Sequence, residues 1–351
     1  MMKSFAVAVF LALGTASVAF SADQLTQPQP RQNGARYERI SVHGDSLVGN
    51  LEGDSPDRMV SVYLPPSYDK NKSRRFPVLY LLHGYTDSDA RWFGLRGKHF
   101  VNVPDAVDRA YASGAKEMIV VMPDAFTKYA GSMYSSSATI GNWEAFVTSD
   151  LVSYIDKHYR TVAKRESRGL AGHSMGGYGT MRLGMKYPGI FSSLYALSPC
   201  CMSANLTPPP EWIAKAAKIG TDAEFEAADF GTKAMIASAA AWSPNPAKGP
   251  KFYDLPVVEG ALVPQVIGQW AANAPLAMVP QYIPNLKTYG AIMIDAGDKD
   301  VPIVDTVKAL DQMLTAFGVA HQAETYSGNH VDHIEERLEK NVMPFFSKTL
   351  K

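Results

Sequence analysis

The sequence contains only two cysteines in 351 residues, and these are the neighbours Cys200 and Cys201. Adjacent side chains rarely reach disulfide geometry, so no disulfide framework is predicted and stability must come from a hydrophobic core. The chain also lacks an excess of either charge, with 34 Lys and Arg against 34 Asp and Glu. This balance excludes the basic stripe of a nucleic-acid-binding protein and the polybasic patch of a membrane-surface protein.

Long apolar runs are absent after the first 21 residues, so no later segment is predicted to span a bilayer. At the N-terminus, Lys3 precedes an apolar run over residues 5–20, and the small residues Ala19 and Ser21 fit a cleavage site before Ala22. We interpret residues 1–21 as a signal peptide. The alternative, a membrane anchor, is disfavoured because small and polar residues interrupt an already short run. The mature protein is therefore expected to be periplasmic or secreted, with no membrane segment.

Residues 22–36 are polar, rich in Gln and Pro, and without periodicity, which predicts a flexible leader. The rest of the chain is different. The whole sequence is 46% hydrophobic and 19% charged, a composition that can bury a full-sized core. We expect one domain over residues 37–351, without an internal repeat.

Short apolar, β-rich runs recur along this domain, and from the third onward helical patterns fill the intervals between them. Strands that alternate with helices form a mostly parallel sheet with helices on both faces, so the fold class is α/β. A helix is predicted over residues 306–317. The predicted strands are residues 37–42, 60–64, 77–82, 118–122, a segment ending at 172, 194–197, 289–295 and 322–326.

The alternation stops over residues 200–287, which we interpret as an insertion between two strands. This segment contains three consecutive prolines, alanine-rich helical stretches and the tryptophans Trp212, Trp242 and Trp270. It is either a helical subdomain that pads the surface or a cap over a site.

The strongest chemical signal is the G-x-S-x-G pentapeptide Gly172-His173-Ser174-Met175-Gly176, which follows a predicted strand and precedes a helical segment. In a nucleophile elbow the serine occupies a strained turn, and the glycines allow strand and helix to pack closely. We predict Ser174 as the nucleophile. The amide of Met175, at the start of the helix, is predicted to donate to an oxyanion.

A second oxyanion donor is expected in the loop after the central strand, which ends in His83-Gly84-Tyr85. We assign this role to the backbone amide of Tyr85. His83 is interpreted as a structural residue that shapes the loop through its ring hydrogen bonds, and His173 as a packing residue.

A general base is expected late in the chain, where His330 and His333 follow the last predicted strand. Asp332 and Glu335 form a D-x-x-E capping pattern, which predicts Asp332 as a helix N-cap and His333 within the first turn. His330 then remains on the loop and is the predicted base. These residues could instead bind a metal, but without a further Cys or His partner the support for zinc is weak.

An acid that orients the base is expected after the strand at residues 289–295. The turn that follows carries both Asp298 and Asp300, and either could reach the imidazole. Asp295 is interpreted as closing the strand structurally.

Four segments resemble the esterase D-type esterases of the α/β-hydrolase fold, and the resemblance extends over most of residues 37–347. The segments are Val62-Tyr63-Leu64-Pro65-Pro66-Ser67-Tyr68, Pro77-Val78-Leu79-Tyr80-Leu81-Leu82-His83-Gly84, Gly172-His173-Ser174-Met175-Gly176-Gly177 and Gly328-Asn329-His330. That family includes feruloyl esterases, S-formylglutathione hydrolases, siderophore esterases and mycolyltransferases. The resemblance thus implies an α/β-hydrolase fold, a Ser-Asp-His order and acyl transfer, without fixing one substrate.

In the family the acid commonly ends a G-x-x-D turn, which corresponds to Gly297 through Asp300 and places Asp300 ahead of Asp298. The chain departs from the family in having Asn329 where glycine is common, and Val331-Asp332-His333 where an aromatic residue often follows. These departures concern how the substrate fits.

The resulting hypothesis is an exported serine esterase that acts through an acyl-enzyme, with no metal or organic cofactor. Its substrate is expected to be a small-molecule or carbohydrate-linked ester, with a hydroxycinnamoyl (feruloyl-type) ester as the leading choice. Two alternatives share the fold, an acyltransferase and a siderophore esterase. A catalytically silent module that binds carbohydrate or protein is the alternative from another class, and the intact Ser174, Asp300 and His330 set argues against it.

Overall fold

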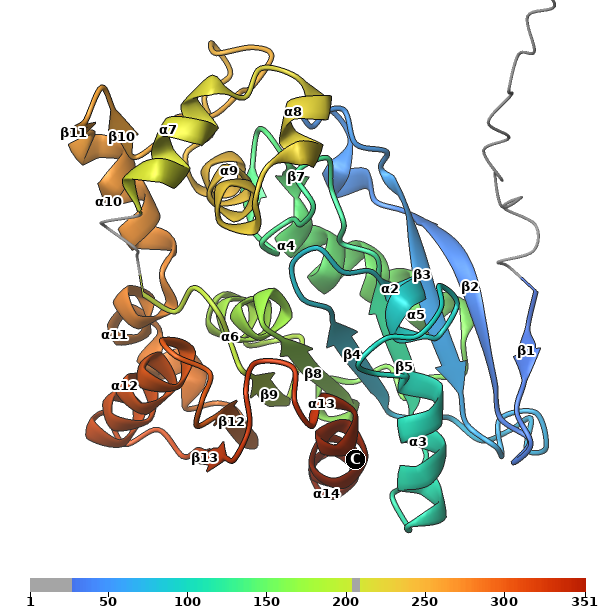
Figure 1. Ribbon diagram of the computed structural model, residues 1–351. Helices are drawn as coiled ribbons and strands as arrows, with labels where there is room; N and C mark the ends of the chain where they lie inside the picture. The colour runs from blue at the N-terminus through green and yellow to red at the C-terminus, as the bar shows by residue number, and fades with distance from the viewer. Residues whose placement is uncertain (1–26, 204–208) are drawn as a thin grey trace, which may run out of the picture.

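The computed structural model describes residues 27–203 and 209–351, and a single large sheet runs through the body of the molecule (Figure 1). The expected signal peptide, residues 1–21, lies outside the described residues. Within these ranges the sheet has nine strands in the order β1-β2-β3-β5-β4-β8-β9-β12-β13. No helix in the same ranges is long and apolar enough to cross a bilayer.

The predicted strands are all present, with ends that shift by a few residues. From β5 through β13 neighbouring strands are parallel, whereas β1, β2 and β3 are antiparallel to their neighbours. The mostly parallel α/β sheet is thus confirmed. The strands are β1 (Gln29–Pro30), β2 (Arg36–His43), β3 (Asp57–Leu64), β4 (Val78–Leu82), β5 (Ile119–Pro123), β8 (Arg168–His173), β9 (Ser193–Leu197), β12 (Ala291–Gly297) and β13 (Gln322–Tyr326).

The first described residues differ from the flexible leader that the sequence predicts. Strand β1 pairs with β2, and the Arg31 guanidinium binds the carboxylates of Asp105 and Asp108. Ala35 is buried. The prediction of a leader through residue 36 is therefore wrong for residues 29–36, because edge pairing and an ion pair attach a segment whose composition alone lacks structural signals.

Helices cover both faces of the sheet, and alternate residues of each central strand serve the two sides. In β4, Tyr80 and Leu82 belong to one buried apolar cluster, and Leu79 and Leu81 belong to the other. The first cluster includes residues of α5 (Leu151–His158), α6 (Met175–Lys186), α11 (Pro275–Leu286) and α12 (Ile303–Ala316). The second includes residues of α2 (Asp89–Trp92), α3 (Val103–Ala112), α13 (Ile334–Arg337) and α14 (Met343–Thr349).

The insertion predicted over residues 200–287 is present and mostly helical. Figure 1 shows it above the sheet-bearing body, with α11 reaching down beside α6. Because the side-chain amide of Asn285 donates to the Met185 carbonyl and Arg182 contacts Met278, α11 belongs to the helical layer of the body. The other described elements of the insertion are here called the cap, as a label for their position: α7 (Pro210–Lys218), α8 (Asp222–Ala227), α9 (Phe230–Trp242), the β10 (Val257–Val258)–β11 (Ala261–Leu262) ribbon and α10 (Pro264–Asn273).

The cap is joined to the body through aromatic packing. Trp242 packs against Tyr178 of α6 and edge-on against Trp270, with ring centroids 5.6 and 5.5 Å apart. The Trp242 indole N–H donates to Ser135 Oγ at 3.2 Å, and the Trp270 indole N–H donates to Ser243 Oγ at 3.0 Å. With only 8% and 4% of their surfaces exposed, Trp242 and Trp270 have almost no free ring face for a ligand.

Candidate active site

Ser174 lies where β8 turns into α6, in the strained conformation of a nucleophile elbow. Its backbone has φ 57° and ψ −115°, and a positive φ is uncommon outside glycine. Hydrogen bonds from the next strand hold this turn. The Ser174 amide donates to the Leu197 carbonyl at 3.0 Å, and the Ser174 carbonyl accepts from the Cys200 amide at 3.1 Å.

The two glycines of the pentapeptide have the close packing that the motif predicts. A Cβ at Gly172 would meet the backbone of Gly176, and a Cβ at Gly176 would meet the carbonyl of Leu82 in β4. Both obstacles are backbone atoms, of helix α6 in the first case and of strand β4 in the second, and backbone atoms cannot move aside as a flexible side chain can. Only glycine fits at either position.

We therefore expect Gly176→Ala to lower the free energy of unfolding by about 3 kcal/mol or more, as overpacking against fixed atoms does. Gly189→Ala is the matched control, since a Cβ there meets nothing within 4 Å. It should change the unfolding free energy by less than about 0.5 kcal/mol, as for ordinary surface substitutions. Urea titrations of both variants measure the difference, and equal midpoints would contradict the packing argument.

A hydrogen-bonded chain joins Asp300, His330 and Ser174. The Nδ1 of His330 lies 2.8 Å from Asp300 Oδ2, and its Nε2 lies 2.9 Å from Ser174 Oγ. Because a carboxylate only accepts, Nδ1 carries the proton and Nε2 accepts from the serine hydroxyl. The structure thus brings together the three side chains predicted as nucleophile, acid and base.

Parallel strands explain how residues so distant in sequence meet. Ser174 follows β8, Asp300 follows β12 and His330 follows β13, and the carboxyl ends of parallel strands share one edge of the sheet. Asp298 has another contact. Its Oδ1 accepts from the Gly328 amide at 3.0 Å, so it ties the two turns together while Asp300 reaches the imidazole.

Asp295 forms a buried ion pair and is separate from this chain. Its Oδ2 accepts from Arg337 Nε of α13 and from the Tyr195 hydroxyl, both at 2.7 Å. Burial raises the pKa of Asp295 to about 6, although Arg337 acts in the opposite direction. Asp295 therefore has a structural role, as predicted, but it does not close the strand, because β12 continues to Gly297.

The predicted cap at Asp332 is wrong. The N-cap of α13 is His333, which has φ 64° and makes no side-chain capping bond. Asp332 instead accepts from the Asn329 amide at 3.0 Å, and His333 Nδ1 lies 3.0 Å from Glu336 Oε2. The Asx-type bonds of the 329–332 loop compete with the cap and hold that loop in shape. His330, Asp332 and His333 thus have separate partners and do not converge as metal ligands would.

His173 has a role that the sequence analysis missed. Its Nε2–H donates to the His330 carbonyl at 2.8 Å, and the two imidazole centroids lie 4.7 Å apart. Burial, with a smaller contribution from the neighbouring His330, lowers the pKa of His173 to about 3, so the ring is neutral. His173 therefore holds the loop that carries His330. The pentapeptide offered no signal for this contact, because the partner lies 157 residues away.

The loop after β4 lies directly beside Ser174. A Cβ at Gly84 would be 3.4 Å from Ser174 Cβ, and one at Gly131 would be 2.6 Å from Tyr85 Cδ2 and 2.8 Å from Met175 Sδ. Tyr85 and Met175 therefore flank the same glycine. Within the described residues no hydrogen bond is made by the Tyr85 amide, which leaves it available to a ligand.

The ring hydrogen bonds predicted for His83 are present. Its Nδ1–H donates to the Gly84 carbonyl and its Nε2 accepts from the Ala125 amide, both at 2.8 Å. His83 is completely buried and thus fixes the loop that presents Tyr85.

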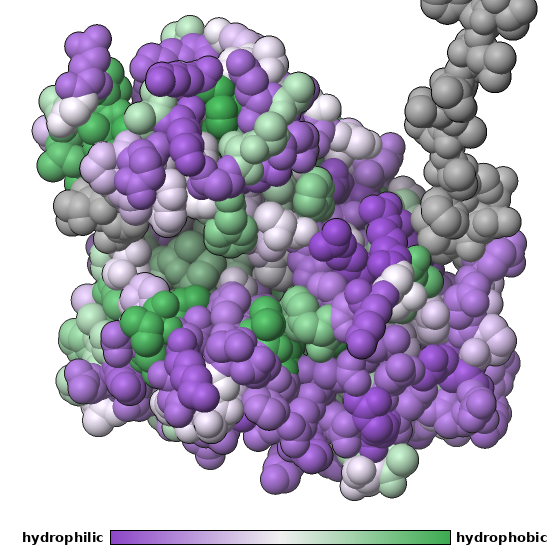
Figure 2. Space-filling model, viewed as in Figure 1, coloured by the Kyte–Doolittle hydropathy of each residue, from purple (hydrophilic) through white to green (hydrophobic). Residues whose placement is uncertain are grey.

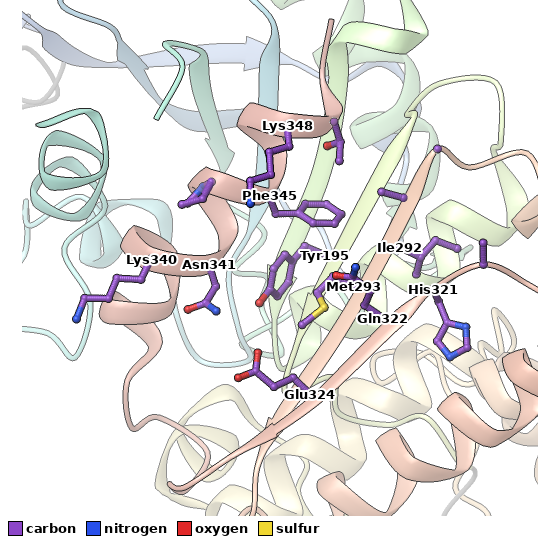
Figure 3. Close-up of a pocket in the computed structure, with 15 residues that line it drawn as sticks. Tyr195, Ile292, Met293, His321, Gln322, Glu324, Lys340, Asn341, Phe345 and Lys348 are labelled. Atoms are coloured by element: carbon purple, nitrogen blue, oxygen red, sulfur yellow. The ribbon is translucent and has the colours of Figure 1, made fainter. Parts of the chain in front are cut away.

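One cavity of the protein lies away from this hydrogen-bonded chain. A pocket of about 530 Å³ lies between β12, β13 and α14, lined by residues such as Tyr195, Glu324 and Lys348 (Figure 3). It contains none of the three hydrogen-bonded side chains. Figure 2 shows a separate hollow between the cap and the body, with hydrophobic residues along part of it.

Comparisons with known proteins support the resemblance seen in the sequence. A profile of the family described as "Putative esterase" matches residues 55–336. An esterase of Mycobacterium tuberculosis is 39% identical over 139 residues, which are 38% of this chain and 27% of that protein. An endo-1,4-beta-xylanase/feruloyl esterase of Xylanibacter ruminicola is 31% identical over 170 residues, 47% of this chain and 23% of that protein. The chain thus spans about a quarter of the length of these relatives.

Solved structures agree on the fold. A ferulic acid esterase superposes with a TM-score of 0.63 at 23% identity, covering 92% of this chain and 100% of that one. At this identity the likeness establishes the α/β-hydrolase fold alone. Since the family profile covers most of the chain, the protein belongs to the putative esterase family of the α/β-hydrolase fold.

Proposed function

We propose that the protein is a serine carboxylic ester hydrolase that acts through an acyl-enzyme. The observation that carries this proposal is the continuous hydrogen bonding from Asp300 through His330 to Ser174 on a strained elbow. Membership of the esterase family supports the same chemistry.

In the proposed reaction Ser174 Oγ attacks the carbonyl carbon of the ester while His330 Nε2 takes the hydroxyl proton. Asp300 accepts from Nδ1–H, which fixes the tautomer and stabilises the imidazolium. The amides of Met175 and Tyr85 donate to the oxyanion of the tetrahedral intermediate. Its collapse expels the alcohol, which leaves with the proton from His330, and water then hydrolyses the acyl-serine by the same steps. No metal or cofactor takes part in this sequence.

The activity is tested with p-nitrophenyl acetate and a p-nitrophenyl hydroxycinnamate. We expect turnover of both, with free acid as the product. Product analysis with an added alcohol separates the alternatives of the same fold, since an acyltransferase would give mainly a new ester. Absence of turnover in folded protein would favour the silent binding module.

We propose hydroxycinnamoyl esters as the substrate class, in line with the feruloyl esterase named among the relatives. An exposed aromatic side chain supports this choice. Phe230, the first residue of α9 in the cap, is 66% exposed and lies edge-on to Tyr85, with ring centroids 5.6 Å apart. Trp242 and Trp270 are buried between the cap and the body and cannot contact the acyl group. Phe230 is exposed, so it can provide the aromatic contact that the proposed acyl group needs.

Phe230→Ala is accordingly expected to raise KM for hydroxycinnamoyl esters about fivefold, the equivalent of one aromatic contact of about 1 kcal/mol, and to spare acetyl esters. Phe317→Ala is the matched control, because Phe317 is 43% exposed at the far end of α12. Steady-state kinetics with both esters give the ratio of KM for the hydroxycinnamoyl ester to KM for the acetyl ester. A parallel change for acetyl and hydroxycinnamoyl esters would remove Phe230 from acyl recognition.

We propose that the protein is exported by way of residues 1–21. Mass spectrometry of protein recovered from the periplasm or medium should show a mature N-terminus at, or within a few residues of, Ala22, because small residues precede it. Exported protein that retains Met1 would refute this proposal.

A further inference from the structure

The two cysteines lie side by side in the segment after β9, where the Cys200 amide contacts the carbonyl of the proposed nucleophile, Ser174. Their Sγ atoms are 2.8 Å apart, although both thiols are free in the structure. In an extended chain consecutive side chains point to opposite sides, so this approach needs a special backbone. Cys201 supplies it with φ 59°, a left-handed conformation that costs a non-glycine residue about 1–3 kcal/mol. The chain thus holds the two sulfur atoms together at an energetic cost.

The segment that carries the cysteines also supports the elbow. Leu197 accepts from the Ser174 amide, and the Cys200 amide donates to the Ser174 carbonyl. Further along, the Met202 carbonyl accepts from the Leu276 amide at 2.9 Å. Residues 197–202, here called the brace, therefore connect Ser174 to the start of α11. A change at Cys200 and Cys201 acts on the backbone that keeps Ser174 in its strained turn.

We propose that Cys200 and Cys201 form a reversible vicinal disulfide that locks the brace behind Ser174. The oxidant is a disulfide of the oxidised glutathione class or a protein thiol oxidase. One cysteine thiolate attacks this disulfide, forms a mixed disulfide and releases the first thiol. The second cysteine loses its proton, attacks the sulfur of the first and releases the second thiol. Two cysteine thiols are oxidised, and one external disulfide is reduced to two thiols.

Chemical environment assigns the order of these steps. The contact with Cys201 and burial raise the pKa of the Cys200 thiol well above its usual value, while the Ser174 hydroxyl acts in the opposite direction. Cys200 is therefore a poor first nucleophile, and Cys201 makes the first attack. The second attack is intramolecular, which compensates for the low reactivity of Cys200.

Reversibility follows from geometry. Adjacent Cα atoms across a trans peptide lie about 3.8 Å apart, below the roughly 4.4–6.8 Å usual for disulfides. A disulfide closed over one peptide bond is strained, and strained disulfides are reduced more easily than structural ones. The cysteine pair is thus suited to reversible oxidation and reduction. As a permanent disulfide it would add little to the stability of the fold.

The covalent part of the proposal does not depend on esterase activity. The folded protein is incubated with oxidised glutathione or with a phosphine reductant, quenched in acid, unfolded and alkylated with iodoacetamide. Oxidised protein should yield an unalkylated peptide containing Cys200 and Cys201 that is lighter by two hydrogen masses, and reduced protein should take up two alkyl groups. Two free thiols, two glutathione adducts or an intermolecular linkage after oxidation would overturn the proposal. Cys201→Ser should never give the lighter peptide.

The effect on the elbow is measured by the rate at which a fluorophosphonate labels Ser174, which rests on the proposed function. We expect the oxidised form to be labelled at least threefold faster than the reduced form, because the closed ring restricts the motion of the backbone that keeps the Cys200 amide on the Ser174 carbonyl. The Cys200→Ala/Cys201→Ala variant should be labelled at one rate under both conditions. Equal labelling rates for the oxidised and reduced wild-type forms would refute the proposed effect of the disulfide on Ser174. The same redox response in the double variant would refute it as well. A complete lack of labelling in every form would instead refute the proposed function.

Discussion

His330→Ala is expected to lower kcat for ester hydrolysis by about 10³-fold or more, because a triad acts as one unit and its base has no substitute. The nitrogen that would take the serine proton lies 2.9 Å from Ser174 Oγ, and alanine removes it. KM should change little, since the imidazole acts mainly on the transition state. Steady-state kinetics with a p-nitrophenyl ester measure both constants.

His333→Ala is the matched control, three residues along the same loop. His333 is half exposed and its Nδ1 contacts Glu336, so its loss should alter kcat less than about twofold, as is usual for surface substitutions. Similar losses of kcat in the two variants would contradict the assignment of His330 as the base.

Asp300→Asn should lower kcat by about 10³- to 10⁴-fold while preserving the fold, as the loss of the triad carboxylate does in serine proteases. An amide in place of Oδ2 can present an N–H to Nδ1. The imidazole then carries its proton on Nε2, where it cannot accept from Ser174. The size of the effect thus depends on the tautomer of His330 more than on the charge lost.

Asp298→Asn gives the control for this substitution. The asparagine carbonyl oxygen can still accept from the Gly328 amide as Asp298 Oδ1 does, so the turn and kcat should be nearly unchanged. If Asp298→Asn lowered kcat more than Asp300→Asn, Asp298 would have to be assigned as the acid of the triad.

Local signals predicted a large part of the fold. Apolar runs such as residues 78–82 and 118–122 are buried on both faces of the sheet, and their continuous hydrophobicity reflects that burial. The end of the leader could not be predicted, since the pairing of β1 with β2 and the ion pairs of Arg31 join segments that carry no local pattern. The family resemblance placed Asp300 ahead of Asp298, a choice that the residue types alone left open.

In the candidate site, too, the features that depend on local sequence were predicted and those that depend on distant contacts were not. The pentapeptide predicted the elbow, because the packing of Gly172 and Gly176 depends on neighbours close in sequence or in the adjacent strand. The hydrogen bond from His173 to the His330 carbonyl, the contact of Phe230 with Tyr85 and the proximity of the two cysteine sulfurs were not predicted. Each depends on how loops close over the sheet, or on one unusual backbone angle.

Covalent labelling with a fluorophosphonate tests the proposed catalytic role of Ser174 most directly, because it reports on an activated serine without any assumption about the natural ester. The proposed role of Ser174 predicts one adduct per chain, located on Ser174 by peptide mass spectrometry, and none in Ser174→Ala. Folded wild-type protein that remains unlabelled, or carries its adduct on another residue, would contradict it.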